Sequence, residues 1–396
     1  MTENRSDDIV IVAAARTPNG RLKGGLAEVS AVDLGAAAIR GALERGGIDP
    51  TSVDAVIMGN VLQAGLGQCP ARQAAVAAGL GWDVPANTVN KVCLSGLTAI
   101  IDAARMIRCG EADVVVAGGM ESMTRAPHLL MGSRSGWTFG HVTAVDSMAN
   151  DGLSDAWSHE AMGLDTDNRT ADYPASREDQ DAFAARSHQL AAKAWSDGVF
   201  ADEIVPVTIP GRKGDTVVDA DEGIRADTTE ETLAKLRPAF RPDGTLTAGN
   251  SSSINDGGAA VVLTTRANAE AKGWTALATL RASAQVAGPS PALAPQPGNA
   301  ILAALAKQGW SVDDLDLIEI NEAFAAVAVY ATGQLGVGID KVNVHGGGIA
   351  YGHPIGQSGA RLVVHLAHEL HRRGTGRAAA ALCGGTGQGD ALLLEA

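Results

Sequence analysis

One strand–turn–helix–strand pattern occurs twice in this chain, and such a duplication restricts the fold to two related halves. The first copy, VNKVCLSGLTAIIDAARMIRCGEADVVVAGG at 89–119, contains one apolar helix face formed by Leu97, Ile100, Ile101, Ala104 and Ile107. In the second copy Val342–Asn343 corresponds to Val89–Asn90, Ser358–Gly359 to Ser95–Gly96, and AAALCGG at 379–385 to VVVAGG at 114–119. Upstream, SVDAVIMGN at 52–60 corresponds to DLDLIEIN at 314–321, so each half ends a strand on an asparagine.

The two copies differ at the turn between strand and helix. Asn90 to Ser95 is five steps, whereas Asn343 to Ser358 is fifteen. The second copy therefore carries about ten extra residues at this turn. The additional loop, GGGIAYGHPI, contains His353. A histidine in a glycine-rich insertion that only one copy has indicates a functional role, whereas His345 is expected to be structural or exposed.

Two cysteines occupy informative places in the duplicated pattern. Cys93 lies at or just before the first turn of the predicted helix. Free N–H groups and the positive dipole end at that position stabilise a thiolate, so we expect a nucleophilic cysteine with a lowered pKa. Cys383 lies at a predicted strand end that the duplication places opposite Cys93. An isolated cysteine is most often a small packing residue, and we keep that interpretation for Cys69 and Cys109.

Alternation of strand-like and helix-like segments predicts an α/β fold with a largely parallel sheet covered on both faces. We expect an N-terminal half over residues 1–273 and a C-terminal half over 274–396. A polar, irregular stretch at about 120–250 has no counterpart in the second copy and predicts an inserted loop domain, a common place for substrate recognition. Its one clear helix follows Ser176 as N-cap, with Asp179 in the capping-box position.

Composition excludes several classes of function. The net charge of −14 argues against a nucleic acid or an anionic membrane as partner. The four cysteines show no CxxC pairing, which argues against a disulfide scaffold and a zinc site, and no metal-ligand cluster is evident. Neither a signal peptide nor a membrane-spanning run is recognisable, so we expect a cytoplasmic location. The glycine-rich turns match neither a P-loop nor a dinucleotide-binding motif.

Six motifs occur in a characteristic order and spacing: NKVCLSG, GGMESMTRAPH, AGNSSSINDG, NEAFA, GHPIGQSGAR and CGGTGQG. Together they resemble the thiolase family, and within it the thiolases that act on acetoacetyl-CoA. The resemblance extends from RTPNG at 16–20 to the last strand. It implies the thiolase fold, with two βαβαβαββ halves in α-β-α-β-α layers and a loop domain inserted in the first half. It also implies a homo-oligomer, either a dimer or a tetramer built as a dimer of dimers.

The resemblance implies a ping-pong Claisen condensation of two acetyl-CoA molecules, or the reverse thiolysis, through an acyl-cysteine. Cys93 would be the nucleophile, His353 would take its proton, and Cys383 would be the base toward the second substrate. Asn321 would hold a water that forms one oxyanion hole with His353, and the N–H groups of Cys93 and Gly385 would form the other. Coenzyme A thioesters are the expected substrates, and no further cofactor or metal is expected.

Contacts to coenzyme A are implied for the insert and its surroundings. Arg225 would lie near the adenine, Ser252 on the pantetheine, and Leu153 and Met162 against apolar parts. Ala323 and Phe324 would line the acyl end, and Ala248 is a further expected contact. This chain departs from the family at Glu160–Ala161–Met162, where a His–Met pair is frequent, at Ser253, where glycine is frequent, and at Thr386 in a glycine run.

Two alternatives remain open at this level. The chain could be a 3-ketoacyl-CoA thiolase acting on longer acyl chains, because pocket volume cannot be obtained from the sequence. It could also be a non-catalytic acyl-CoA-binding protein, although such a protein would be expected to lose a nucleophile, base or oxyanion asparagine. A related decarboxylating condensing enzyme would carry a histidine where this chain has Cys383.

Overall fold

The N-terminal half contains a complete strand–helix series. The computed structural model describes residues 5–396. The elements are β1 (Ile9–Arg16), β2 (Gly20–Arg21), α1 (Ala31–Gly46), β3 (Ala55–Gly59), α2 (Pro70–Ala77), β4 (Ala86–Val89), α3 (Ser95–Arg108), β5 (Val114–Ser122) and, after the insert, β10 (Asn255–Thr265). Strands β1 and β5 are buried along their whole length, which explains their continuous apolar sequences. Helix α7 (Arg266–Lys272) leads to the second half.

The C-terminal half repeats this series with one strand missing. Its elements are β11 (Ala278–Ala287), α8 (Gln296–Gln308), β12 (Leu317–Ile320), α9 (Ala325–Leu335), α10 (Gly348–Tyr351), α11 (Ser358–Arg373), β13 (Arg377–Gly384) and β14 (Gln388–Glu395). The counterpart of β4 is reduced to one parallel bridge between Ile318 and Val342. Asn343 has a φ of +46° and its side-chain amide bonds both the N–H and the C=O of Ile320 at 2.8 Å. A side chain therefore takes the hydrogen bonds that a longer strand would make.

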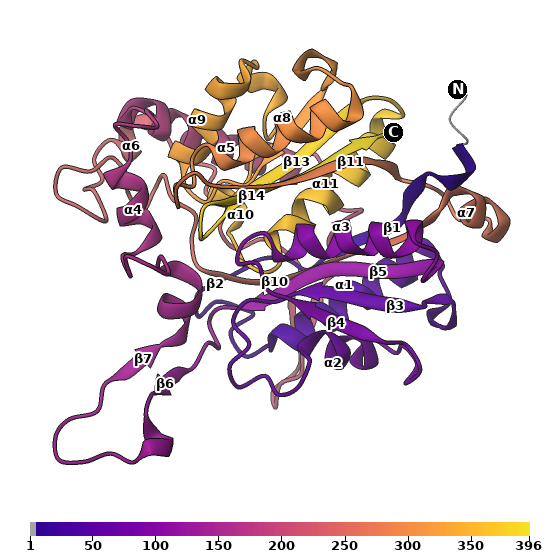
Figure 1. Cartoon of the computed structure of the whole chain (residues 1–396), viewed down its shortest axis with the longest axis horizontal. Helices are drawn as coiled ribbons and strands as arrows, with labels where there is room; N and C mark the ends of the chain where they lie inside the picture. Colours follow the sequence, from indigo (N-terminus) through magenta and orange to yellow (C-terminus); the bar gives the residue numbers. More distant parts are fainter. Residues whose placement is uncertain (1–4) are drawn as a thin grey trace.

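The insert between β5 and β10 consists of short elements and one long helix. They are β6 (His128–Leu130), β7 (Ala144–Asp146), α4 (Met162–Asn168), α5 (Arg177–Ser196), β8 (Val207–Ile209), β9 (Thr216–Val218) and α6 (Glu230–Leu233). Ser176 caps α5 as predicted, because its Oγ accepts from the N–H of Asp179 at 3.0 Å. The β6–β7 hairpin and its long tip form an arm, residues 128–146, that projects from the body (Figure 1).

The strands of the two halves, β2 apart, join in one continuous order, β12-β13-β14-β11-β1-β10-β5-β3-β4, and β2 pairs with β10 beside it. The halves meet where β1 pairs with β11 through Val10–Thr279 and Ile11–Ala278. Parallel pairs are limited to β3–β4, β3–β5 and β12–β13. The prediction of a largely parallel sheet was therefore wrong. Strand β10 returns from the insert antiparallel to both β1 and β5, and β13–β14 form a hairpin.

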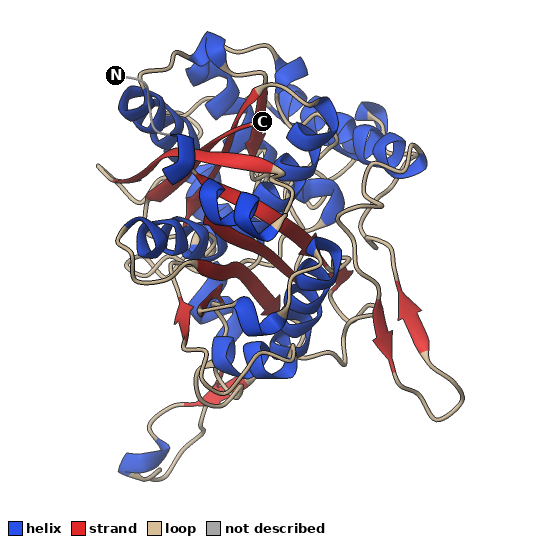
Figure 2. Cartoon of the chain, turned by 90° about the vertical axis from the view of Figure 1, so that its right-hand side faces the viewer, coloured by secondary structure: helices blue, strands red, loops and turns tan. Residues whose placement is uncertain are grey.

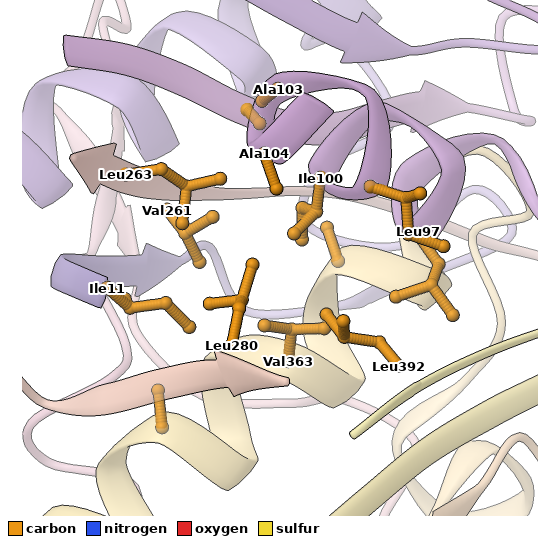
Figure 3. Packing of buried hydrophobic residues seen from close by; sticks show 14 of the residues in the cluster. Ile11, Leu97, Ile100, Ala103, Ala104, Val261, Leu263, Leu280, Val363 and Leu392 are labelled. Atoms are coloured by element: carbon orange, nitrogen blue, oxygen red, sulfur yellow. The ribbon is translucent and has the colours of Figure 1, made fainter. Parts of the chain in front are cut away.

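The layers follow the α-β-α-β-α order that the motifs imply. Helices α3 and α11 pack between the strands of the two halves, α1 and α2 cover the outer face of the first half's strands, and α8 and α9 cover that of the second half's. Figure 2 shows helices packed around and between the strands. The central core combines Leu97 and Ile100 of α3, Val363 of α11, and strand residues of both halves such as Val261 and Leu392 (Figure 3). Within residues 5–396 no helix is both long and apolar enough to cross a membrane.

Candidate active site

A cavity of about 450 Å³ opens where the ends of the central helices meet the insert. Its wall brings together four of the predicted reacting groups from both halves: Cys93, His353, Cys383 and Gly385. Five of the predicted coenzyme A contacts also line it, namely Leu153, Met162, Ser252, Ala323 and Phe324. Cys93 comes from the turn before α3, His353 from the loop before α11, and Cys383 from the end of β13. The duplication therefore places its two cysteines in one chamber, as the sequence predicts.

Cys93 is partly buried, and its pKa moves in the direction opposite to the prediction. Burial raises the pKa of Cys93 to about 12, although the backbone N–H groups of Gly385 and Cys93 point at the sulfur and oppose the rise. Helix α3 begins at Ser95, and two N–H groups at its start are already used. The N–H of Leu94 bonds the carbonyl of Lys91 and that of Ser95 bonds the carbonyl of Val92. The helix start therefore stabilises the Cys93 thiolate less than the position of Cys93 in the sequence suggests.

His353 is held as a neutral base. Its Nδ1 lies 2.6 Å from Ser358 Oγ, whose own hydrogen goes to the carbonyl of Pro354 at 2.8 Å. The hydroxyl therefore accepts, so Nδ1 carries the ring proton and Nε2 is the unprotonated nitrogen that can accept one. Burial lowers the pKa of His353 to about 3, with a further contribution from the charge of Arg361. The backbone N–H of His353 is anchored on Asn255 Oδ1 at 3.0 Å.

Asn321 lies behind this histidine, outside the cavity wall. It follows β12 and is wholly buried, with Nδ2 at 3.4 Å from Nε2 and 3.5 Å from Nδ1 of His353. Its Oδ1 is buried and has no hydrogen-bond partner among the described residues. A buried amide oxygen of this kind is one that an ordered water would satisfy.

Cys383 is fully buried against Leu293, Ala323 and Val327, and burial raises the pKa of its thiol well above the ordinary value. The protein's own packing leaves room at Gly385, because an added Cβ would meet Val92 only at 3.4 Å. The tight position is Gly384, where a Cβ would lie 2.7 Å from Leu94 Cγ. Thr386 adopts a φ of +72° and donates its hydroxyl to the carbonyl of Gly385.

Two predicted coenzyme A contacts lie outside the cavity. Arg225 and Ala248 are exposed and absent from its wall. The N–H of Arg225 donates to His188 Nδ1 at 3.2 Å. Ser252 lines the cavity, but its hydroxyl donates to the carbonyl of Ala323 at 2.9 Å. Ser253, a departure from the family pattern, lines the wall and donates to Asn255 Oδ1 at 2.8 Å, next to the anchor of His353.

The remaining predicted groups have mixed outcomes. Cys69 and Cys109 are exposed, so their interpretation as packing residues was wrong. His345 bonds His365 at 3.1 Å, which confirms a structural role. In the part of the chain that the structure describes, no group of three or more His, Cys, Asp or Glu side chains could hold a metal ion.

Sequence reasoning missed Glu121 as a residue of the site. It is wholly buried in β5 and contributes to the electrostatic environment of Cys93. The available signal was an acidic residue in the otherwise uncharged strand VVVAGGMES.

Two stacked halves that present paired cysteines and a histidine to one cavity define the class of protein. The chain belongs to the thiolase family: the family models described as thiolase N-terminal domain and thiolase C-terminal domain match residues 9–267 and 274–396.

Individual relatives match over almost the whole chain. A protein of Mycolicibacterium smegmatis named "probable acetyl-CoA acetyltransferase" is 58% identical over 98% of this chain and 100% of its own. The acetyl-CoA acetyltransferase of Pseudomonas aeruginosa is 53% identical over 98% of this chain and 99% of its own. The crystal structure of the acetyl-CoA acetyltransferase of Bacillus anthracis is similar with a TM-score of 0.95 at 42% identity, covering 99% of this chain and 100% of that one. The thiolase fold is therefore confirmed.

Proposed function

We propose that this protein is an acetyl-CoA C-acetyltransferase that condenses two acetyl-CoA molecules to acetoacetyl-CoA and coenzyme A, and catalyses the reverse thiolysis. The observation that carries the proposal is the shared cavity of Cys93, His353 and Cys383, with two backbone N–H groups directed at the Cys93 sulfur. The names and full-length similarity of the relatives support the same activity. Coenzyme A thioesters act as substrates, with no further cofactor.

Acylation would begin with a neutral pair. As the Cys93 sulfur attacks the carbonyl carbon of acetyl-CoA, its proton passes to His353 Nε2, which the Nδ1–Ser358 contact keeps unprotonated. The new oxyanion would lie toward the N–H groups of Cys93 and Gly385, which already point at the sulfur. Collapse breaks the carbon–sulfur bond to coenzyme A, the leaving thiolate takes the proton from His353, and acetyl-Cys93 remains.

The second step would use Cys383. In thiolysis Cys93 gives its proton to His353 Nε2 and attacks the 3-keto carbonyl, the carbon–carbon bond breaks, and the acetyl-CoA carbanion takes the Cys383 proton, which His353 then replaces. Burial keeps that thiol protonated, which suits the acid role. In condensation Cys383 would first give its proton to His353 Nε2, its thiolate would remove the α-proton of the second acetyl-CoA, and the carbanion would attack acetyl-Cys93, whose departing sulfur takes the proton back from His353. The Nε2–H that His353 then carries, together with a water held by the amide of Asn321, would stabilise the enolate oxygen.

We propose that the protein works as a homo-oligomer. The tip of the arm exposes Met131, Trp137 and Phe139, with Phe139 fully exposed. A cluster of large exposed apolar side chains on a projecting hairpin is typical of a protein–protein contact. The assembly is predicted to be a dimer or a tetramer. The cytoplasmic location also stays a prediction.

Thiolysis of acetoacetyl-CoA by wild type, Cys93→Ala and Cys383→Ala tests the function, with mass spectrometry of protein incubated with acetyl-CoA. We expect acetylation at Cys93 in wild type and in Cys383→Ala, and loss of turnover by roughly a thousandfold or more in both variants. Cys109→Ala, at an exposed cysteine outside the cavity, is the control and should keep its turnover.

The same assay with a long-chain 3-ketoacyl-CoA separates the alternatives. Faster turnover of the longer substrate would favour a 3-ketoacyl-CoA thiolase. Neither acetylation nor turnover with either substrate would identify a non-catalytic acyl-CoA-binding protein.

A further inference from the structure

Glu121 is a buried carboxylate whose four hydrogen-bond partners are all donors. Oε1 accepts from Asn60 Nδ2 at 2.8 Å and from the N–H of Leu62 at 3.1 Å. Oε2 accepts from the N–H groups of Val61 and Gly356, both at 3.0 Å. Two donors on each oxygen fit an ionised carboxylate, because a protonated acid would direct its own hydrogen at another donor.

These donors come from two separate parts of the chain. Asn60, Val61 and Leu62 follow β3 in the N-terminal half, whereas Gly356 belongs to the loop that carries His353 in the C-terminal half. The carboxylate therefore joins the two halves at the cavity. Removing its charge would leave buried N–H groups unsatisfied, at a cost of about 1–3 kcal/mol each.

The loop that carries His353 packs closely on the backbone of β5. A Cβ at Gly356 would lie 2.7 Å from Glu121 Oε2 and 2.9 Å from the carbonyl of Met120. A Cβ at Gly119 would lie 2.0 Å from the carbonyl of Gly356. At this spacing, a change in the Glu121 contact has to move the loop rather than be absorbed by the packing.

The segments that Glu121 holds also contact the nucleophile. Val61, Leu62 and Ile355 form one apolar cluster, against which Cys93 and Leu153 pack. Ile355 lies between His353 and Gly356 in sequence and lines the cavity with Cys93. The position of His353 relative to the Cys93 sulfur therefore depends on how Val61–Leu62 and Gly356 are held together.

We infer that Glu121 is a positioning residue of the acyl-transfer reaction, which fixes the loop of His353 against the segment that packs on Cys93. The inference rests on the proposed function. Glu121 is absent from the cavity wall and acts through His353. Burial raises the pKa of Glu121 to about 7, against the opposing effect of three backbone N–H groups, so the assay belongs at pH 8.

The test is Glu121→Gln, which keeps the shape but places an NH₂ group among donors. We expect kcat for acetoacetyl-CoA thiolysis, per folded subunit, to fall by about tenfold to a hundredfold because a small displacement of a reacting group has an effect of this size. KM should stay within about threefold. Glu203→Gln is the control, because Glu203 is equally buried and pairs with Arg16 at 2.7 Å outside the cavity wall. It should reduce stability and leave kcat unchanged.

A double-mutant cycle separates positioning from general structural damage. In the His353→Ala background, Glu121→Gln should change the rate of Cys93 acetylation by less than about twofold, because the group through which it acts is gone. A full, additive loss in that background would overturn the inference, and so would an unchanged kcat in the single variant. If wild type itself does not acetylate Cys93, the proposed function fails before Glu121 is tested.

A second variant covers the case in which Glu121→Gln does not fold. Gly356→Ala disturbs the same contact from the other side, since its Cβ would collide with Glu121 Oε2. It should reproduce the fall in kcat at nearly constant KM. A Gly356→Ala enzyme with wild-type kcat would overturn the inference.

Discussion

The reacting groups of the cavity are all neutral at rest. Burial raises the pKa of Cys93 to about 12, raises that of Cys383, and lowers that of His353 to about 3. An apolar chamber disfavours every charged form, whichever sign the group would carry. Charge is therefore created only when a substrate arrives whose oxyanion can be stabilised, and the thiol proton is transferred as the sulfur attacks.

The rate at which iodoacetamide alkylates Cys93 measures the thiolate fraction of this residue. Because the pKa of the thiol is raised, the thiolate fraction at neutral pH is small and grows about tenfold per pH unit. We expect the alkylation rate of the free enzyme to keep rising from pH 7 to about 9.5, where cysteine in an unstructured model peptide, with an ordinary pKa near 8.5, already levels off. Peptide mass spectrometry isolates Cys93 from the exposed cysteines. A plateau near pH 7 would show instead a thiolate stabilised by the helix start.

At the residue scale, the sequence was most informative about which groups meet and least informative about their environment. The motifs and the duplication brought Cys93, His353 and Cys383 together correctly. The lowered pKa expected for Cys93 failed because burial and the use of nearby N–H groups are tertiary properties. The role of Glu121 was invisible for the same reason, since three of its partners are backbone N–H groups distant in sequence.

At the scale of elements, the crossing of α3 and α11 links the fold to the site. The two helices approach at Gly96 and Gly359, the pair that the duplication had already aligned. A Cβ at Gly96 would lie 2.8 Å from the N atom of Ala360, and one at Gly359 would lie 2.5 Å from that of Leu97. These contacts fix the starts of both helices, and the preceding turns carry Cys93 and His353.

Gly359→Ala should therefore lower both stability and turnover. Overpacking at a backbone contact of this kind reduces the free energy of unfolding by about 1–3 kcal/mol, which thermal denaturation would detect. The control is Gly333→Ala in α9, where an added Cβ meets nothing within 4 Å. That variant should be neutral or stabilising by up to about 1 kcal/mol, because alanine is the better helix former. Equal melting temperatures for the two variants would contradict the role of the crossing.

Local sequence patterns predict some elements of this fold and not others. Helix α3 and the start of β5 lie where the pattern at 89–119 predicts them, because the apolar periodicity there is strong. The loss of the β4 counterpart in the C-terminal half was not predictable, since this loss depends on the Asn343 side chain bonding the backbone of Ile320. Strand direction was misjudged for β10 because the alternation of strands and helices carries no information across a long insert.

At the scale of the whole molecule, the duplicated halves build the body and the insert adds what only one half has. Most of the cavity's reacting groups come from the duplicated turns, whereas Leu153 and Met162 come from the insert. The arm takes no part in that cavity, because none of residues 128–146 lies in its wall. Its exposed apolar tip therefore needs an explanation other than catalysis.

If the tip is a contact between copies of this chain, a Trp137→Ser/Phe139→Ser variant should form a smaller assembly. Loss of two large exposed apolar side chains removes the hydrophobic gain of association, at roughly 25 cal/mol per Å² of area that a partner would cover. Light scattering after size exclusion would show the lower mass. The kcat per subunit should stay within about twofold, because the arm is remote from the cavity wall. Val217→Ser, which removes an exposed apolar side chain from the β8–β9 hairpin, is the matched control and should leave the mass unchanged. An unchanged mass in the arm variant would assign the oligomer contact to another surface, and a fall in both variants would point to general destabilisation instead.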